Sequence, residues 1–378
     1  MIIKKLGVRQ SNFELLRIIA MFLIVLHHAM VHGTLTVSGN SVLKTGNPLT
    51  FGIYNFLAFG GKVGVYIFVL ITGYFMINSK IALKKVVKLW LPIFFWSIMV
   101  TLSYEVVKHD FSIIKIVKSA FPIFFNQYWF MTVYFFLYLL IPLMNEGIRN
   151  FSIKQELWCI TLGLVIMFPN NFFYGSVVGG QLVNLVVVYF IGAFIREHDL
   201  LQEKRFRFLS TWSCWLSVIL IFITAFGFSF IGFSLKSVRL LKAASFFTDG
   251  LTETFFCLFI ALGLFVWIGS KKIGYHKFIN TVAATTFGIY LIHDNGLMRA
   301  LLWIKVFHME NLIGTPIYGV MYVLIVVLII FVSCSLLEFI RKEIFSKFEN
   351  KAANKLNILG NKMLNWLLAN EHIGWFSK

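Results

Sequence analysis

The stretch Ser11–His32, SNFELLRIIAMFLIVLHHAMVH, combines an apolar helical pattern with an arginine near its start and a histidine near its end. Arg17 and His28 are eleven residues apart, so on a helix they lie within about 20° of one face and roughly 16 Å apart. A cation and an imidazole are costly to expose to lipid, which favours a face turned toward a protein interior or a cavity. Glu14 precedes Arg17 by three residues, so we expect its carboxylate to hold the guanidinium.

The composition indicates a polytopic membrane protein. Of the 378 residues, 59% are hydrophobic and only 13% are charged, whereas soluble domains average about 25% charged residues. Many apolar runs approach twenty residues and lack the alternation of barrel strands, which predicts an all-α fold. The four isolated cysteines indicate neither a disulfide framework nor a zinc site, and no metal is expected. The net charge of +18 fits basic loops beside anionic lipid, so no nucleic-acid partner is expected.

The apolar runs predict about ten transmembrane helices. They cover, in chain order, residues 12–32, 59–78, 84–106, 128–146, 156–170, 181–196, 208–231, 250–269, 280–303 and 315–340. Residues 108–127 carry lysines among apolar residues and predict an interfacial or re-entrant segment. An even number of spans puts both termini on one side of the membrane. Lys and Arg are in excess in the terminal segments and the links on that side, which identifies it as the cytoplasm.

Two regions follow from this pattern. Residues 1–340 are predicted to form one integral-membrane domain. Residues 341–378 are predicted to form a basic cytoplasmic tail, in which lysines are mixed with apolar side chains as in an amphipathic helix on the inner leaflet. The first apolar run is too long for a signal peptide and lacks a small-residue cleavage site, so we interpret it as a retained helix. No second soluble domain is expected.

The two polar side chains of the first helix suit different chemistry. Imidazole has an ordinary pKa of about 6.5, which makes His28 a candidate general base, and the guanidinium of Arg17 can grip phosphate or carboxylate with two hydrogen bonds. An elongated ligand such as a coenzyme A thioester would reach from one to the other. Proton-coupled transporters also place His and Arg across the membrane. In a simpler interpretation, Arg17 snorkels to a headgroup and His28 lies at the opposite interface.

Several stretches carry a resemblance to a known family. They are the Arg17–His28 pair with ten residues between its members, GGKVGVYIFVLITGYF at Gly60–Phe75, KKVVKLWLP at Lys84–Pro92, YWFM at Tyr128–Met131 and TFGIYLIHDN at Thr286–Asn295. Together they resemble the integral-membrane acyltransferase family 3 over roughly residues 11–340. The chain departs from the family pattern at Thr72, where serine is commoner, and at Lys85 and Lys88, where arginines are frequent.

The resemblance implies a bacterial plasma-membrane enzyme that transfers an acyl group, usually acetyl from acetyl-CoA, to a hydroxyl of a cell-envelope glycan or its lipid-linked precursor. His28 would be the catalytic base or acyl relay, and Glu14 is grouped with it as a catalytic candidate. Arg17 would hold the donor. Three lysines at the inner surface would meet the phosphates of coenzyme A: Lys84, Lys85 and Lys88. Acyl-CoA would be a co-substrate, with no bound cofactor.

Four further residues are candidates for an acceptor site: Tyr128, Trp129, His293 and Asp294. The two aromatic rings could stack on a sugar, although Trp and Tyr at a helix end more often belong to the aromatic belt. His293 and Asp294 are near the outer end of the ninth predicted helix, where they could join His28. The alternative function is a non-enzymatic transporter or flippase for a glycan or lipid intermediate, with Arg17 and His28 along its path.

Overall fold

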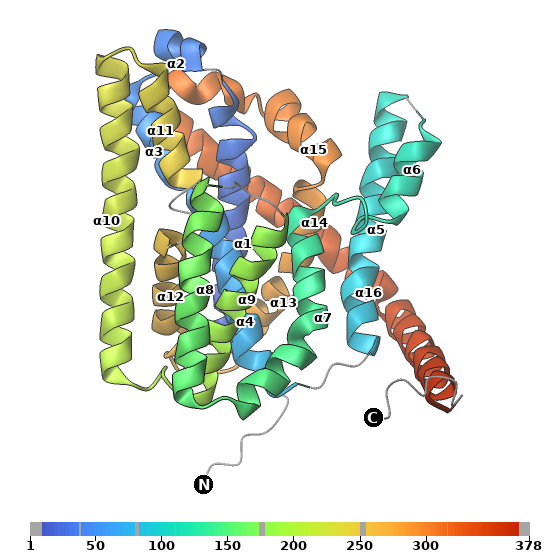
Figure 1. Cartoon of the computed structure of the whole chain (residues 1–378). Coiled ribbons are helices and arrows are strands. Elements are labelled where there is room, and N and C mark those ends of the chain that lie inside the picture. The colour runs from blue at the N-terminus through green and yellow to red at the C-terminus, as the bar shows by residue number, and fades with distance from the viewer. Residues whose placement is uncertain are drawn as a thin grey trace.

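The computed structural model describes residues 10–37, 39–79, 83–109, 111–173, 178–249, 255–315 and 317–369, and every regular element in these ranges is a helix (Figure 1). The elements near the site are α1 (Ser11–Val31), α3 (Pro48–Ala58), α4 (Gly60–Met76), α5 (Leu83–Lys108), α7 (Trp129–Asn150), α12 (Phe255–Gly269), α13 (Lys277–Ala283), α14 (Thr286–His293), α15 (Gly296–Ala300) and α16 (Ile317–Ala369). The other α-helices are α2 (Gly39–Thr45), α6 (Ile113–Ala120), α8 (Ile153–Phe173), α9 (Val178–Glu197), α10 (Lys204–Ser234) and α11 (Val238–Asp249). Two segments are 3-10 helices, η1 (Thr34–Thr36) and η4 (Met309–Gly314), and η3 (Leu301–Val306) is a π-helix.

Helix α1 lies at the centre of the bundle, and α4 packs along it at close range (Figure 1). A Cβ atom at Gly64 would lie 2.4 Å from the carbonyl oxygen of Ala20, and one at Gly61 would lie 2.4 Å from the ring of His27. Residues without a Cβ allow two membrane helices to approach this closely. The contact therefore fixes the direction in which the side chains of α1 point.

The stretch predicted as one helix over residues 280–303 is broken into α13, α14, α15 and a π-helical segment, so that prediction is wrong in its continuity. The side chain of Asn295 accepts a hydrogen bond from the backbone N–H of Leu297 at 3.0 Å and caps α15. The apolar pattern runs through the breaks, so periodicity alone predicts a single helix. The break between α14 and α15 places His293 and Asp294 in the buried interior.

Seven of the described helical stretches are long and apolar enough to cross a membrane: Ser11–Thr36, Pro48–Met76, Leu83–Lys108, Trp129–Asn150, Gly180–Glu197, Lys204–Ser234 and Ile317–Met363. The all-α, multi-pass membrane class is therefore confirmed, while the count of about ten and the cytoplasmic side of the termini stay predictions. Helix α12 is a shorter apolar helix, and residues 250–254 of the helix predicted there lie outside the described residues.

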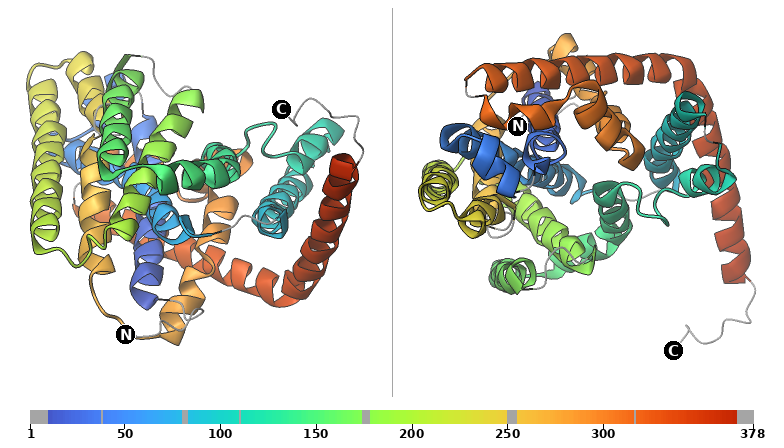
Figure 2. Two further views of the ribbon diagram at one scale, coloured as in Figure 1. Left: turned by 60° about the horizontal axis from the view of Figure 1, so that its bottom comes forward. Right: turned by 90° about the horizontal axis from the view of Figure 1, so that it is seen from above.

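The predicted tail is in part a continuation of the last span. Helix α16 runs without interruption from Ile317 to Ala369, and residues 370–378 lie outside the described part of the chain. Figure 2 shows that α16 first crosses the bundle and then bends, so that its C-terminal part lies at one side of the molecule, where it contacts α5. The location of this segment on the inner leaflet stays a prediction.

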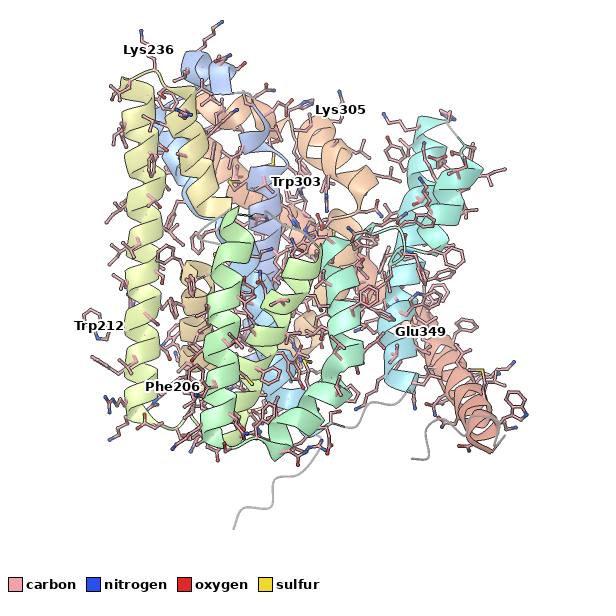
Figure 3. The ribbon with its side chains drawn as sticks, viewed as in Figure 1. Phe206, Trp212, Lys236, Trp303, Lys305 and Glu349 are labelled. Carbon is pink, nitrogen blue, oxygen red and sulfur yellow. The ribbon has the colours of Figure 1, made fainter. Side chains whose placement is uncertain are left out.

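Apolar side chains cover much of the outer surface. On α10, Trp212 is 63% exposed, and Figure 3 shows it pointing away from the bundle. Trp303, by contrast, is fully buried inside it. A helix with large apolar side chains on its outward face suits contact with lipid, where such groups need no cover from water.

Candidate active site

His28 is held in the interior between α1 and α14. Its Nδ1 lies 2.9 Å from Nε2 of His293, and Nδ1 of His293 lies 2.6 Å from the carbonyl oxygen of Ile289. Because a carbonyl oxygen can only accept, Nδ1 of neutral His293 carries the hydrogen and its Nε2 accepts from Nδ1–H of His28. This order of donors leaves the lone pair of His28 on Nε2, the atom that would act as a general base.

Asp294 lies beside that nitrogen. Its Oδ1 is 3.5 Å from Nε2 of His28 and 3.9 Å from Nε2 of His32. Arg299 binds the same carboxylate through two hydrogen bonds, from Nε at 2.8 Å and from Nη2 at 3.1 Å. A carboxylate fixed in this way stabilises the imidazolium that forms when His28 takes up a proton.

His28, His32 and Asp294 also have the residue types of a metal site. One ligand atom from each lies within 4.8 Å of the others. A metal ion there would have to compete with the guanidinium of Arg299, which engages both oxygens of Asp294. The cluster therefore suits proton transfer better than metal binding, and the expected lack of a metal stays a prediction.

Tyr128 and Asn295 brace the break between α14 and α15. The hydroxyl of Tyr128 donates to the carbonyl oxygen of Leu291 at 3.0 Å and accepts from Nδ2 of Asn295 at 2.8 Å. Tyr128 is buried, so these bonds position the backbone that carries Asp294. A contact between Tyr128 and an acceptor stays a prediction.

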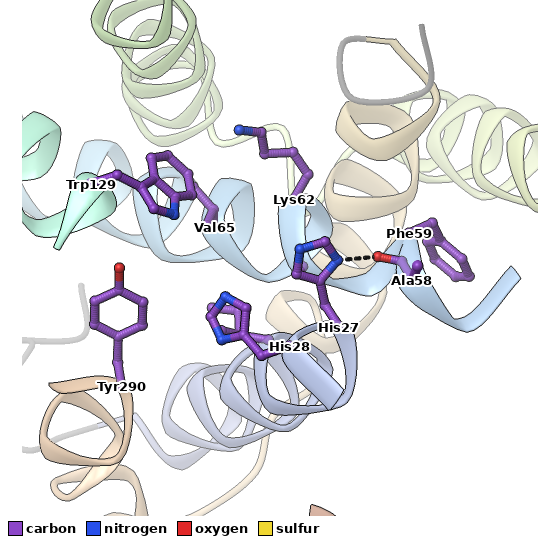
Figure 4. A pocket seen from close by; sticks show the side chains of 10 residues that line it. His27, His28, Ala58, Phe59, Lys62, Val65, Trp129 and Tyr290 are labelled. Carbon is purple, nitrogen blue, oxygen red and sulfur yellow. Dashed lines mark hydrogen bonds between the residues drawn. The ribbon is translucent and has the colours of Figure 1, made fainter. Parts of the chain in front are cut away.

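A pocket of about 40 Å³ lies at His28 (Figure 4). Trp129 and Tyr290 are at one end of it, and Phe59 is at the other. The ammonium of Lys62 lies 4.3 Å from the centre of the Trp129 ring, within the range of a cation–π interaction. The structure thus brings Trp129, a residue predicted for the acceptor site, to the same pocket as His28.

A second cavity, of about 260 Å³, lies at the other end of the α1 face. Glu14 and Arg17 both line it, and Nη1 of Arg17 donates to Oε1 of Glu14 at 2.9 Å, which confirms the predicted pair. A guanidinium has five N–H donors, so Arg17 keeps others for an anion in the cavity. Lys342 of α16 adds a second cation to the lining, and its Nζ donates to the carbonyl oxygen of Ala284 at 2.5 Å.

Tyr290 of α14 borders both spaces. It lines both the pocket at His28 and the cavity at Arg17. Its ring is buried and packs edge-on against Phe130, with 5.7 Å between the ring centres. The two spaces are therefore neighbours on either side of this one side chain.

The lysines predicted for the donor lie in the first two turns of α5: Lys84, Lys85 and Lys88. The residue of α5 that lines the cavity is Leu89 instead. The backbone N–H of Lys84 donates to Oδ1 of Asn357, and Nζ of Lys85 donates to Oγ of Ser79. The structure does not bring these lysines into the cavity, and their contact with a donor stays a prediction.

Sequence reasoning missed four residues of these sites: Lys62, Tyr290, Arg299 and Lys342. Lys62 and Tyr290 lie within stretches that carry the family resemblance, but nothing in those stretches marks a role for them. Arg299 is a cation inside an apolar segment, which is a signal for function in a membrane protein. Lys342 falls in the predicted tail, because the sequence does not show that α16 continues past the last predicted span.

The comparison with protein families agrees with the resemblance. The chain matches the family model described as "Acyltransferase domain" over residues 10–337. This range includes both cavities except for Lys342, and all of the polar cluster around His28. No curated protein and no solved structure matches the chain. Because the match spans most of its length, the chain belongs to the integral-membrane acyltransferase family 3.

Proposed function

We propose that the protein transfers an acetyl group from acetyl-CoA to a hydroxyl of a cell-envelope glycan, or of its lipid-linked precursor, at a bacterial plasma membrane. The observation that supports this proposal is the pair of cavities that meet at Tyr290, with Arg17 at one end and His28 at the other. Coenzyme A thioesters are elongated, with phosphates at one end and the reactive carbonyl at the other. They fit a site with an anion-binding group about 16 Å from a base.

The residues around His28 suggest the chemical step. Nε2 of His28 removes the proton from the acceptor hydroxyl while its oxygen attacks the thioester carbonyl. The carbon–sulfur bond then breaks, and the leaving thiolate takes the proton back from the imidazolium, which releases coenzyme A as a thiol. Asp294 stabilises the imidazolium between these two proton transfers, and Arg299 and His293 hold the carboxylate and the ring in place.

The residues at each end suggest where the substrates bind. Arg17, fixed by Glu14, and Lys342 provide positive charge for the phosphates of the donor. On the acceptor side, the Trp129 ring could stack on a sugar, and Lys62 beside it offers hydrogen bonds. The lysines of α5 would act only where the nucleotide extends beyond the cavity.

The proposal is tested with purified protein in proteoliposomes, acetyl-CoA labelled in its acetyl group, and an envelope glycan extract. We expect label in the glycan and one free coenzyme A for each acetyl group transferred. If glycan crosses the membrane while no label is transferred and no coenzyme A is released, the chain acts as a transporter.

Replacing Arg17 with alanine should raise the KM for acetyl-CoA by about 10- to 100-fold, with a smaller change in kcat. The reason is the loss of a charge-assisted hydrogen bond, worth about 1.5–3 kcal/mol, at a part of the donor that does not react. The measurement is steady-state kinetics with varied acetyl-CoA. Arg149→Ala, at an exposed arginine paired with Glu146, is the matched control and should leave KM unchanged. An unchanged KM in Arg17→Ala would rule out the donor contact.

A further inference from the structure

An apolar groove of about 540 Å³ lies beside the pocket at His28. It is formed by side chains of α1, α10 and α12, which include Leu23, Val218 and Leu264. Trp215 and Trp267 also line it, and both are more than half exposed on the outside of the bundle. The groove is more than ten times larger than the pocket, so it offers room for a hydrocarbon chain that the pocket does not.

Phe59 stands between these two spaces. It lines the pocket at His28 and also lines the groove. Phe59 is the single residue between α3 and α4, and the next residue, Gly60, packs against the backbone and side chain of Leu23 on α1. Its own carbonyl oxygen lies 3.7 Å from Sγ of Cys257 on α12. The backbone at Phe59 is therefore held where four helices meet: α1, α3, α4 and α12.

The cavity at Arg17, the pocket at His28 and the apolar groove are neighbours in that order. The donor cavity and the pocket at His28 share Tyr290 as a lining residue, and the pocket and the apolar groove share Phe59. Figure 4 shows Tyr290 and Phe59 at opposite ends of the pocket. A thioester whose carbonyl lies at His28 after passing Tyr290 would direct its acyl chain toward Phe59.

We propose that Phe59 determines the length of the acyl group that this enzyme accepts. This inference rests on the proposed function. The pocket, at about 40 Å³, is more than ten times smaller than the groove, at about 540 Å³, so it has room for an acetyl group but not for a long chain. Because Phe59 is the residue that lines both spaces, we expect that removal of its ring opens this end of the pocket toward the groove and gives a longer chain an apolar path.

The test compares acetyl-, butyryl- and octanoyl-CoA as donors for the native protein and for Phe59→Ala in nanodiscs with an envelope glycan extract. Acceptor-dependent thiol release gives kcat/KM for each donor, and displacement of labelled acetyl-CoA gives their affinities without turnover. We expect the ratio of octanoyl to acetyl kcat/KM to rise by at least about 10-fold in Phe59→Ala. Phe59→Leu should admit butyryl-CoA while still excluding octanoyl-CoA.

Phe56→Ala is the matched control. Its ring packs against Phe59 with 5.2 Å between ring centres, but it is not among the residues that line the pocket or the groove. The donor ratios should therefore stay as in the native protein. Unchanged ratios in both Phe59 variants, or equal use of octanoyl- and acetyl-CoA by the native protein, would overturn the inference. Failure of the native protein to use any of the three donors would instead contradict the proposed function.

Discussion

Replacing His28 with alanine should lower the rate of acyl transfer by about 10³-fold, because general base catalysis contributes about 10²- to 10⁴-fold. The variant loses the Nε2 lone pair that faces Asp294 and the hydrogen bond from Nδ1 to His293. The measurement is the initial rate of label transfer from acetyl-CoA to glycan, at saturating donor. The KM for acetyl-CoA should change little, since the phosphate end of the donor lies at Arg17.

His276→Ala is the control for the loss of an imidazole. Its side chain is exposed and lies outside the polar cluster, so this variant should transfer acetyl at the native rate. The thermal unfolding midpoint of both variants shows whether the fold is intact. Native activity in a folded His28→Ala protein would exclude His28 as the base.

Replacing Asp294 with asparagine should lower kcat by about 10²- to 10⁴-fold, the range that general base catalysis contributes, because the imidazolium that forms at His28 loses the carboxylate beside it. The amide has nearly the same size but carries no charge, so an imidazolium at His28 and the guanidinium of Arg299 both lose their partner. The measurement is kcat at saturating acetyl-CoA and glycan, for protein whose folded fraction is known.

Removal of one member of a buried ion pair also lowers the free energy of unfolding, by about 3–5 kcal/mol. The control must therefore remove a buried charge that is also paired. Glu105 is fully buried and pairs with Lys115 at 2.9 Å, and it lines neither the pocket at His28 nor the cavity at Arg17. Glu105→Gln should therefore lower stability while kcat per folded molecule stays near the native value. An equal loss of kcat in the two variants would mean that Asp294 acts only through the fold.

The sequence predicts much of one helix face and little of what packs against it. The spacing of Arg17 and His28 follows from helical geometry, and the contact of Glu14 with Arg17 follows from a separation of three residues. Both features are local, so they can be predicted without knowledge of the tertiary fold. The cavity at Arg17 and the pocket at His28 agree with the predicted interior face.

The residues that pack against this face of α1 are placed by helix ends that apolar periodicity does not predict. His293 and Asp294 reach His28 because the chain turns after α14, and Arg299 reaches Asp294 because Asn295 caps a new helix there. In the same way, Lys342 reaches the cavity because α16 extends past the predicted end of the last span. The sequence marks these positions only as polar residues inside apolar segments, a pattern that indicates function in membrane proteins.

The most direct test of the central claim is acceptor-dependent release of free thiol from acetyl-CoA by the purified native protein in nanodiscs. We predict release that increases with added envelope glycan extract and is matched by acetyl groups bound to that glycan. A folded protein that binds no acetyl-CoA and releases no thiol with a range of glycan extracts would contradict the account and favour a transporter.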